Sequence, residues 1–284
     1  MTPAAAVDRY AVIGHPVAHS RSPFIHRAFA LATGQAMEYT RLECPIGGFE
    51  AVLRDFAAGG ARGCNVTLPF KFDALRLAAR RTARAELAGA ANTLRFDESG
   101  WLADNTDGIG LVRDIEANAR VAIAGRRMLL IGAGGAAAGA LGALLAAAPA
   151  ELTVTNRTLE KASELVTRHR AATDANDVVL HAAPLERCGE GFDIVVNATA
   201  SSLHGAASPV DARTLAPGAL AIDMMYGPAA QPFLAWAEQH GATGRDGLGM
   251  LVEQAAQSFL LWRGVMPETA PVLDALRRRW DETA

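Results

Sequence analysis

The stretch Met128-Leu-Leu-Ile-Gly-Ala-Gly-Gly-Ala-Ala137 decides the fold of this chain. Four apolar residues precede the pattern Gly-x-Gly-x-x-Ala, and an alanine-rich segment that favours a helix follows it. A strand, a glycine-rich turn and a helix in this order are typical of a dinucleotide-binding βαβ unit. Gly132 permits the tight turn, Gly134 lets the backbone approach a pyrophosphate, and Ala137 keeps the helix close to the strand. The expected phosphate contacts come from Gly132, Ala133, Gly134, Gly135 and Ala136.

Short apolar segments alternate with helix-like segments on both sides of this motif. After the strand at 128–131, further strands are predicted at 152–155, 177–180, 194–197 and 220–223. Before it, strands are predicted at 10–13, 37–42 and 63–66, with a hairpin of 93–96 and 101–103, and helices at about 23–33, 47–58, 70–81 and 108–118. This alternation indicates an α/β fold with mainly parallel sheets and crossover helices.

The length of the chain predicts two domains, because 284 residues exceed what one hydrophobic core usually supports. The strand at 128–131 begins a new βαβ series, and helices predicted at about 249–263 and 270–280 follow that series and cross back. Residues 1–107 and 247–284 are therefore predicted to form a discontinuous α/β substrate-binding domain. Residues 108–246 are predicted to form a Rossmann-type cofactor-binding domain.

Composition excludes several classes of function. The chain is 50% hydrophobic and 20% charged with a formal net charge of −3, which argues against disorder, a nucleic-acid-binding surface and a polybasic membrane patch. Three dispersed cysteines and an N-terminus without signal-peptide features predict a cytoplasmic protein. Seven histidines without metal-ligand spacing give no reason to expect a metal. The expected partner is a small molecule, bound by a monomer or a homodimer.

Selectivity for the cofactor is predicted by the residues after the second strand of the nucleotide-binding series. An NAD-binding domain usually has an acidic residue there, which accepts a hydrogen bond from the ribose 2′-hydroxyl. This chain has Asn156-Arg157-Thr158 instead. A guanidinium can pair with a 2′-phosphate, and no carboxylate is present to repel it, so NADP is favoured over NAD. Lys161 could add a second positive charge or could be a solvated helix lysine.

Polar residues of the first domain gather in loops that follow predicted strands. Ser20 and Ser22 lie two residues apart in the loop after the first strand, where two hydroxyls could bind a carboxylate, although Ser22 alone could cap the next helix. Lys71 begins a predicted helix, a position that the helix dipole makes unfavourable for a cation. That position suggests a general acid and base. Asn92 and Asp107 add an amide and a carboxylate shortly before the domain junction.

Seven ordered motifs make the chain resemble the shikimate dehydrogenase family over residues 10–265. They are Ser20-Arg-Ser22-Pro, Asn65-Val-Thr67-Leu-Pro69-Phe-Lys71, Gly89-Ala-Ala-Asn92-Thr93, Asn105-Thr106-Asp107-Gly108, Gly132-Ala-Gly-Gly-Ala, Asn156-Arg157-Thr158 and Gly247-Leu-Gly-Met-Leu-Val-Glu-Gln254-Ala-Ala. The resemblance implies the reversible reduction of 3-dehydroshikimate to shikimate by NADPH, on the route to chorismate and the aromatic amino acids.

The resemblance also assigns roles to residues. It implies that Lys71 and Asp107 are the catalytic pair, with Lys71 at the ketone. It implies substrate contacts from Ser20, Ser22, Thr67, Lys71, Asn92, Asp107, Tyr226 and Gln254. On the cofactor side, it adds Thr199, Met224 and Gly247 to the glycine turn, to residues 156–158 and to Lys161. The chain departs from the family at Ala83, often acidic, and at Lys161, often arginine; both departures put cofactor affinity in doubt.

Three other hypotheses remain open on the sequence. A sibling enzyme that prefers quinate or NAD is disfavoured by the paired serines and by Arg157. A non-catalytic NADPH-binding module is disfavoured by the presence of both Lys71 and Asp107. A folate-type dehydrogenase with similarly arranged domains is disfavoured by the Ser-x-Ser and Asn-Thr-Asp-Gly loops.

Overall fold

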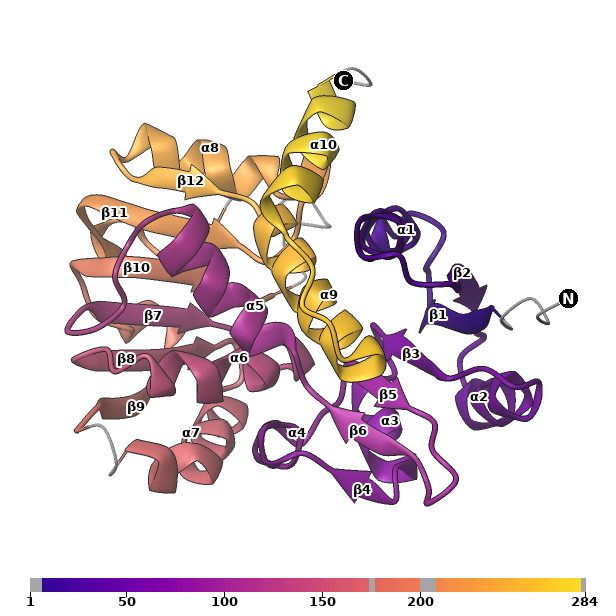
Figure 1. The fold of residues 1–284 in the computed structure, drawn as a ribbon. Helices are drawn as coiled ribbons and strands as arrows, with labels where there is room; N and C mark the ends of the chain where they lie inside the picture. Colours follow the sequence, from indigo (N-terminus) through magenta and orange to yellow (C-terminus); the bar gives the residue numbers. More distant parts are fainter. Residues whose placement is uncertain (1–6, 174–176, 200–207, 282–284) are drawn as a thin grey trace, which may run out of the picture. The chain divides into compact units, whose positions relative to one another are not determined.

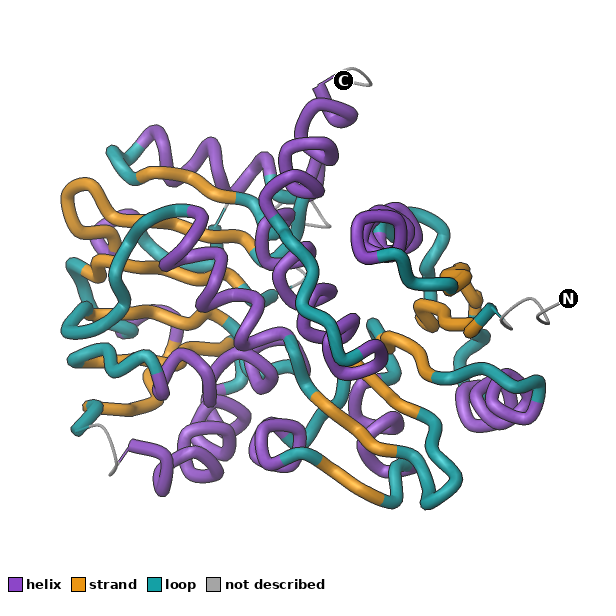
Figure 2. Tube along the Cα trace, in the orientation of Figure 1, coloured by secondary structure: helices purple, strands orange, loops and turns teal. Residues whose placement is uncertain are grey.

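The computed structural model describes residues 7–173, 177–199 and 208–281. Residues 1–6, on which the prediction of a missing signal peptide partly rests, lie outside the described residues. The chain divides into two compact units (Figure 1), which we call unit 1 (Met1–Thr106 with Leu251–Ala284) and unit 2 (Asp107–Met250). Figure 2 shows that each unit contains both strands and helices. The fold is α/β, as predicted.

The division differs by a few residues from the predicted domain boundaries. Asp107 and residues 247–250 were assigned to the first domain, whereas the structure groups them with unit 2. Asp107 begins helix α5 (Asp107–Arg113), which packs against α6 (Gly135–Ala146). Met250 belongs to the apolar core of unit 2. Packing against neighbouring helices, which a pattern along the chain does not reveal, sets these boundaries.

Unit 2 is built on a six-stranded parallel sheet with the order β12-β11-β10-β7-β8-β9. The strands are β7 (Arg127–Ile131), β8 (Glu151–Asn156), β9 (Val179–Pro184), β10 (Phe192–Asn197), β11 (Leu215–Asp223) and β12 (Thr243–Arg245). The chain winds outward from β7 in one direction through β8 and β9, and in the other through β10, β11 and β12. A topological switch point therefore lies between β7 and β10, where ligands of open α/β sheets bind.

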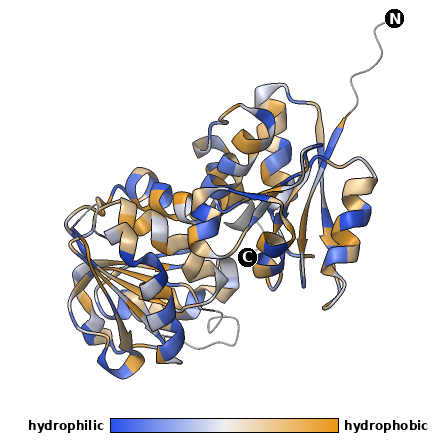
Figure 3. Cartoon of the chain, turned by 90° about the horizontal axis from the view of Figure 1, so that it is seen from below, coloured by the Kyte–Doolittle hydropathy of each residue, from blue (hydrophilic) through white to orange (hydrophobic). Residues whose placement is uncertain are grey.

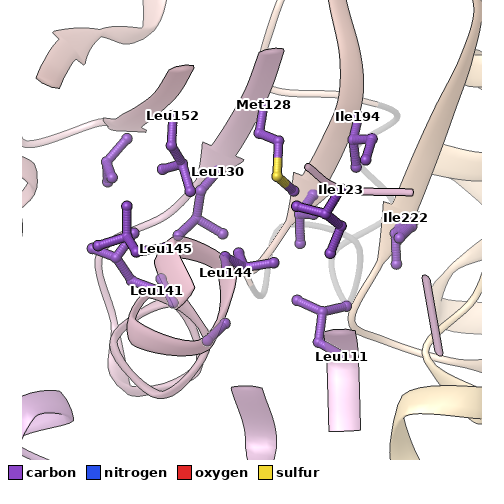
Figure 4. Packing of buried hydrophobic residues seen from close by; sticks show 14 of the residues in the cluster. Leu111, Ile123, Met128, Leu130, Leu141, Leu144, Leu145, Leu152, Ile194 and Ile222 are labelled. Atoms are coloured by element: carbon purple, nitrogen blue, oxygen red, sulfur yellow. The ribbon is translucent and has the colours of Figure 1, made fainter. Parts of the chain in front are cut away.

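Both faces of this sheet are covered by apolar side chains. Met128 and Leu130 of β7 belong to one cluster, with residues of α5, α6 and α7 (Leu159–Thr173). Leu129 and Ile131, which alternate with them, belong to a second cluster with residues of α8 (Gln231–Gln239). Figure 4 shows Met128 and Leu130 among leucines of α6. In Figure 3, the strands of the unit 2 sheet, at the lower left, are mostly orange, the colour of hydrophobic residues. A strand buried on both faces is continuously apolar, which explains the sequence 128–131.

Unit 1 contains a mixed sheet with the order β2-β1-β3-β5-β6-β4. Its strands are β1 (Asp8–Gly14), β2 (Met37–Glu43), β3 (Gly63–Val66), β4 (Arg80–Arg81), β5 (Thr93–Arg95) and β6 (Leu102–Asp104). Strands β1, β2 and β3 are parallel, whereas β5 runs antiparallel to both β3 and β6. The predicted hairpin of 93–96 and 101–103 is therefore confirmed as β5 and β6.

The helices of unit 1 follow the predictions except around residue 80. They are α1 (Ser22–Thr33), α2 (Phe49–Ala58), α3 (Lys71–Leu77), α4 (Ala83–Ala88), most of α9 (Leu248–Arg263) and α10 (Ala270–Asp281). The prediction of one helix at 70–81 was wrong. Arg80 and Arg81 pair with β6 as strand β4, and Thr82 then caps α4 by accepting a hydrogen bond from the Ala85 amide. Tertiary pairing with β6 overrides the helical pattern.

The helix predicted at 108–118 continues past α5 as a π-helical turn at Asp114–Asn118. The fully buried Asp114 carboxylate accepts two hydrogen bonds from Arg245 of β12, at 2.9 and 2.5 Å.

Short 3₁₀ helices lie at Leu185–Arg187, Ala212–Thr214 and Gly227–Ala229. No helix of the described ranges is long and apolar enough to cross a membrane.

Candidate active site

The motif-bearing loops of unit 1 gather at one edge of its sheet. Strands β1, β2 and β3 all end at this edge, because they are parallel and in register. The antiparallel β5 begins there, since Asn65 pairs with Thr93, and β6 ends there, since Thr93 pairs with Asp104. The topology thus places the loops after β1, β3 and β6 and the loop before β5 side by side.

The two serines of the first loop are neighbours. The Ser20 and Ser22 hydroxyl oxygens are 3.2 Å apart, and Ser20 Oγ also accepts a hydrogen bond of 3.3 Å from the Ser22 amide. Ser22 is the first residue of α1 and is buried, whereas Arg21 occupies the N-cap position without a side-chain hydrogen bond. Ser22 is therefore not the helix cap, and its hydroxyl is paired with that of Ser20.

Thr67 and Lys71 lie on the next loop and the helix that follows it. Thr67 is half-buried, and its amide donates to the Ile13 carbonyl at 2.9 Å, which ties this loop to the end of β1. Lys71 is half-buried as the first residue of α3, where the sequence predicted it. Its carbonyl accepts a 2.9 Å hydrogen bond from the Ala91 amide, next to Asn92. The lysine and the Asn92 loop are thereby joined through the backbone.

Asn92 lies at the centre of a buried polar network. Its Nδ2 donates to Thr106 Oγ1 at 2.9 Å and to Gln254 Oε1 at 3.2 Å. Its Oδ1 accepts hydrogen bonds of 2.9 Å from the Thr106 amide and from Thr93 Oγ1. Asn92 and Gln254 are 3% and 8% exposed, so water competes little for these bonds. Two predicted substrate contacts from distant parts of the sequence are brought together here.

Ser258 and Asn65 extend the network beneath Asn92. Asn65 Nδ2 donates to Ser258 Oγ at 2.9 Å, and Ser258 Oγ lies 2.8 Å from Thr93 Oγ1 and 3.3 Å from Thr106 Oγ1. The side-chain oxygen Oδ1 of Asn65 accepts a 2.7 Å hydrogen bond from the hydroxyl of Tyr39. Because burial raises the pKa of Tyr39, this hydroxyl stays a neutral donor.

The sequence assigned no role to Asn65, Thr93, Thr106 or Ser258. Asn65 could have been noticed as a polar residue within a short strand whose residues are all buried. Ser258 lies one helical turn after Gln254, a spacing that places both on one face of α9. By spacing alone, Gln257, three residues after Gln254, is an equal candidate for that face. The structure gives the position to Ser258, which is fully buried, whereas Gln257 is partly exposed.

The carboxylate of Asp104 anchors the Asn-Thr-Asp-Gly loop. It is fully buried and accepts hydrogen bonds from Thr82 Oγ1 at 2.7 Å, from the Arg84 guanidinium and from the Asn105 amide at 2.8 Å. Asp107, three residues later, is 5% exposed and is the first residue of α5. A carboxylate in the first turn of a helix is stabilised by the helix dipole.

In unit 2, the glycine-rich turn follows β7 at the switch point. Gly132 has a φ of 114°, a conformation that favours glycine, and a Cβ there would lie 3.2 Å from the Ala198 backbone. At Gly134, an added Cβ would meet no atom of the described residues within 4 Å. Helix α6 begins at Gly135. The turn therefore leaves open space beside the first turn of a helix, as a bound pyrophosphate requires.

The residues predicted to select NADP follow β8 at the same edge. Asn156 is partly exposed and donates a 2.9 Å hydrogen bond to the Thr158 carbonyl, which closes the turn. Arg157, Thr158 and Lys161 are exposed. Ile131 pairs with both Thr155 and Asn197, so the ends of β7, β8 and β10 lie level. The predicted nucleotide contacts of unit 2 thus share one edge.

A buried pair holds the loops after β10 and β11. Asn197 Nδ2 donates to Asp223 Oδ2 at 3.0 Å, and both side chains are fully buried. Asn197 Oδ1 accepts from Thr199 Oγ1 at 2.7 Å, and the Met224 amide donates to the Asn197 carbonyl at 2.9 Å. Asn197 thus fixes two of the predicted cofactor contacts, whereas Asp223 had no role in the prediction.

Gly247 and Tyr226 complete the predicted set in unit 2. A Cβ at Gly247 would lie 2.3 Å from the Met224 carbonyl oxygen, so this glycine lets two backbones pass closely. Tyr226 is partly buried.

Within the described ranges, no group of three or more His, Cys, Asp or Glu residues could hold a metal ion.

A doubly wound parallel sheet with a glycine turn at its switch point, and a separate α/β unit with a polar network, define a two-domain dehydrogenase class. Family models match three parts of the chain: the shikimate dehydrogenase substrate binding domain at residues 12–94, shikimate/quinate 5-dehydrogenase at 115–208, and the shikimate 5′-dehydrogenase C-terminal domain at 247–277. The chain belongs to the shikimate dehydrogenase family.

Individual relatives agree with this assignment. The chain is 63% identical to a shikimate dehydrogenase (NADP⁺) of Methylibium petroleiphilum over 96% of this chain and 95% of the relative. Its structure is similar to that of an Ael1 enzyme from Pseudomonas putida, with a TM-score of 0.86, 46% identity, and coverage of 95% and 98% of the two chains. It is also similar to shikimate 5-dehydrogenase from Thermus thermophilus in complex with NADP(H) and shikimate, with a TM-score of 0.83, 32% identity, and coverage of 95% and 99%.

Proposed function

We propose that this chain is an NADP-dependent shikimate dehydrogenase, an oxidoreductase that reversibly reduces the ring ketone of 3-dehydroshikimate to the hydroxyl of shikimate. The observation that supports it most directly is the concentration of hydroxyl, amide and ammonium groups at one edge of the unit 1 sheet. Amides and hydroxyls discriminate hydroxyl patterns on a ring, because an analogue without the matching group leaves a buried polar atom unpaired. Unit 1 accordingly binds the substrate and unit 2 binds NADP.

The substrate contacts divide by chemistry. Ser20 and Ser22 bind the carboxylate through their adjacent hydroxyls. Asn92 and Gln254 bind ring oxygens, and Thr106 supports both of them through hydrogen bonds. Thr67 and Tyr226 contribute further contacts. Because the protein already orients the Asn92 amide, substrate binding orders few additional groups, which lowers the entropic cost.

Lys71 and Asp107 are the proposed catalytic pair. NADPH, when bound, supplies a hydride to the carbonyl carbon. The carbonyl electron pair then moves onto oxygen, where the Lys71 ammonium stabilises the charge and donates a proton to form the hydroxyl. Asp107 orients this ammonium and binds a neighbouring hydroxyl of the ring. In the reverse direction, neutral Lys71 accepts the proton.

The cofactor contacts follow the parallel strands of unit 2. Residues 132–136 bind the pyrophosphate with backbone amides at the beginning of α6. Arg157 binds the 2′-phosphate, with contributions from Asn156, Thr158 and Lys161. Thr199, Met224 and Gly247 border the nicotinamide side. We further infer a cytoplasmic protein that acts as a monomer or a homodimer.

The test is NADP⁺ reduction at 340 nm with shikimate, repeated with quinate, with NAD⁺ and with Lys71→Ala. We expect turnover with shikimate and NADP⁺, and a loss of about 10²–10⁴-fold in kcat in the variant. A preference for quinate or NAD⁺ would keep the chemistry and overturn the specificity. If wild-type protein turned over none of these pairs, the proposed function would be wrong.

A further inference from the structure

Three alternate residues of β2 contact the loop that carries the serine pair or the helix α1 that follows it. Tyr39, Arg41 and Glu43 project from one face of the strand, since side chains of a strand alternate. Tyr39 stacks on His26 of α1 with ring centroids 4.2 Å apart. The Glu43 carboxylate accepts a 2.9 Å hydrogen bond from the Val17 amide and lies 2.9 Å from His15 Nδ1. Strand β2 therefore supports the loop at residues 15 and 17 through Glu43, and the following helix α1 through Tyr39.

Arg41 contacts this loop at the first serine. Its Nε and Nη2 donate to the Ser20 carbonyl oxygen at 2.9 and 2.6 Å, and the residue is exposed. Among the residues that the structure describes, no carboxylate forms an ion pair with Arg41. A carbonyl oxygen carries no net charge, so these hydrogen bonds leave the positive charge of the guanidinium uncompensated.

Two other charged groups lie near the loop that carries the serine pair. Glu43, which follows Arg41 on the same face of β2, keeps its negative charge, because a hydrogen bond from the Val17 amide does not neutralise it. Its contacts are with Val17 and His15 rather than with Ser20. Arg21 lies between the two serines in the sequence and has interactions of its own. Arg41 therefore places a positive charge at Ser20, although two serines alone would recognise a neutral polar group equally well.

We propose that Arg41 determines specificity for substrates with a negatively charged carboxylate, by placing a positive charge directly beside the serine pair. The inference rests on the proposed function and deepens it. Ser20 and Ser22 donate hydrogen bonds to the carboxylate, whereas Arg41 acts through space and distinguishes the anion from its neutral ester. The charge is near the surface, so salt screens it: the Debye length is about 8 Å at physiological ionic strength.

The test uses two substrates that differ only in this charge, shikimate and its methyl ester. Steady-state KM and kcat are measured for the wild type, Arg41→Gln, Arg41→Ala and Arg41→Lys, at low and high salt. Glutamine keeps an N–H donor for the Ser20 carbonyl but removes the charge, and lysine keeps the charge. Arg54→Ala is the matched control, because Arg54 is an exposed arginine of α2 that pairs with Glu50.

We expect Arg41→Gln to raise the KM for shikimate about tenfold, the equivalent of one close charge interaction, with little change in kcat. The KM for the ester should stay within twofold in every variant. Arg41→Lys should remain close to wild type, and high salt should raise the wild-type KM for shikimate towards that of Arg41→Gln.

Two results would overturn the inference while leaving the proposed function intact. One is an unchanged KM for shikimate in Arg41→Gln. The other is an equal rise for acid and ester, which would mean that Arg41 only supports the loop. If instead the wild type did not oxidise shikimate at all, the proposed function itself would fail. Arg41→Lys and Arg41→Gln provide the comparison even if Arg41→Ala does not fold.

Discussion

The two units prepare their ligand sites in different ways. Unit 2 uses backbone and small residues, with open space at Gly134 and a positive φ at Gly132. Arg157, the side chain that we propose selects NADP, is exposed. Unit 1 uses buried side chains that bond one another, and the bond between Asn65 and Ser258 joins residues 193 positions apart. A backbone site depends on local sequence. A side-chain network depends on the packing of a whole unit. We therefore expect a mutation in the unit 1 network and a mutation at the backbone site of unit 2 to have different effects on stability and binding.

The largest expected effect separates a glycine that the fold needs from one that the ligand needs. In Gly247→Ala, the new Cβ would lie 2.3 Å from the Met224 carbonyl oxygen, so the backbone must shift. We expect a loss of about 1–3 kcal/mol in the free energy of unfolding, as for other overpacked sites. Gly134→Ala should unfold like wild type and raise the KM for NADP⁺ about tenfold, near 1.4 kcal/mol.

Thermal denaturation and steady-state kinetics on both variants measure these effects. The same substitution is made twice, so each variant is the control for the other. Equal destabilisation by the two changes would contradict the idea that Gly134 borders open space, and an unchanged KM in Gly134→Ala would remove it from the phosphate site.

The second prediction concerns acid sensitivity, which we expect to be greater in unit 1. Burial lowers the pKa of His26 from 6.5 to about 3. Between these values the unfolded chain binds a proton that the folded chain does not, so the free energy of unfolding falls as pH falls. Each pH unit in this window costs up to about 1.4 kcal/mol. His26→Gln should remove this part of the acid dependence.

Urea denaturation of the wild type and of His26→Gln at pH 7, 6 and 5 measures how the free energy of unfolding changes with pH. His169→Gln is the counterpart in unit 2, where burial also lowers the pKa of His169 while its Nδ1 lies 2.9 Å from the Leu165 carbonyl oxygen. An acid slope that His26→Gln leaves unchanged would show that His26 does not carry the effect.

The third prediction concerns Arg157, the exposed arginine of the proposed cofactor site in unit 2. Arg157→Ala should raise the KM for NADP⁺ about tenfold, because a charge-assisted bond to a 2′-phosphate contributes near 1.5 kcal/mol. The KM for NAD⁺, which lacks this phosphate, should not rise, and thermal stability should be unchanged because Arg157 is exposed. Lys161→Ala is the control for loss of a nearby charge and should have a smaller effect. Equal changes for NADP⁺ and NAD⁺ would count against the assignment of Arg157.

The smallest effect is expected within the buried network. Ser258→Ala removes an acceptor of the Asn65 amide, which keeps Thr93 Oγ1 and the Asn92 carbonyl as partners at 3.1 and 3.2 Å. We therefore expect a loss of about 1 kcal/mol in the free energy of unfolding, the low end for a buried hydrogen bond. The KM for shikimate should rise severalfold and that for NADP⁺ should not change. Gln257→Ala, at the neighbouring position of α9, is the control and should leave both KM values at wild-type levels. If Gln257→Ala changed the KM for shikimate and the free energy of unfolding as much as Ser258→Ala, the effect could not be assigned to the network.

Much of the fold could be predicted from particular segments. The apolar segment 128–131, the glycine turn after it and the alanine-rich segment that follows all predict a strand, a turn and a helix. The structure has β7 and α6 there. The segment 70–81 shows where prediction fails, since Arg80 and Arg81 form β4 only because β6 pairs with them. Strand β12 was missed because its three residues, Thr-Gly-Arg, carry no apolar pattern and depend on pairing with β11.

The sequence by itself determined the α/β class, the glycine turn, and the positions of Ser20, Ser22, Lys71 and Arg157 at the ends of elements, because these depend on periodicity and turn chemistry within a few residues. Only the tertiary structure decided that Ser258 rather than Gln257 joins Asn65, and that Arg41 bonds the Ser20 carbonyl. Such contacts join segments distant in the sequence. They depend on which strands pair and which helix face packs inward, and no local pattern encodes those choices.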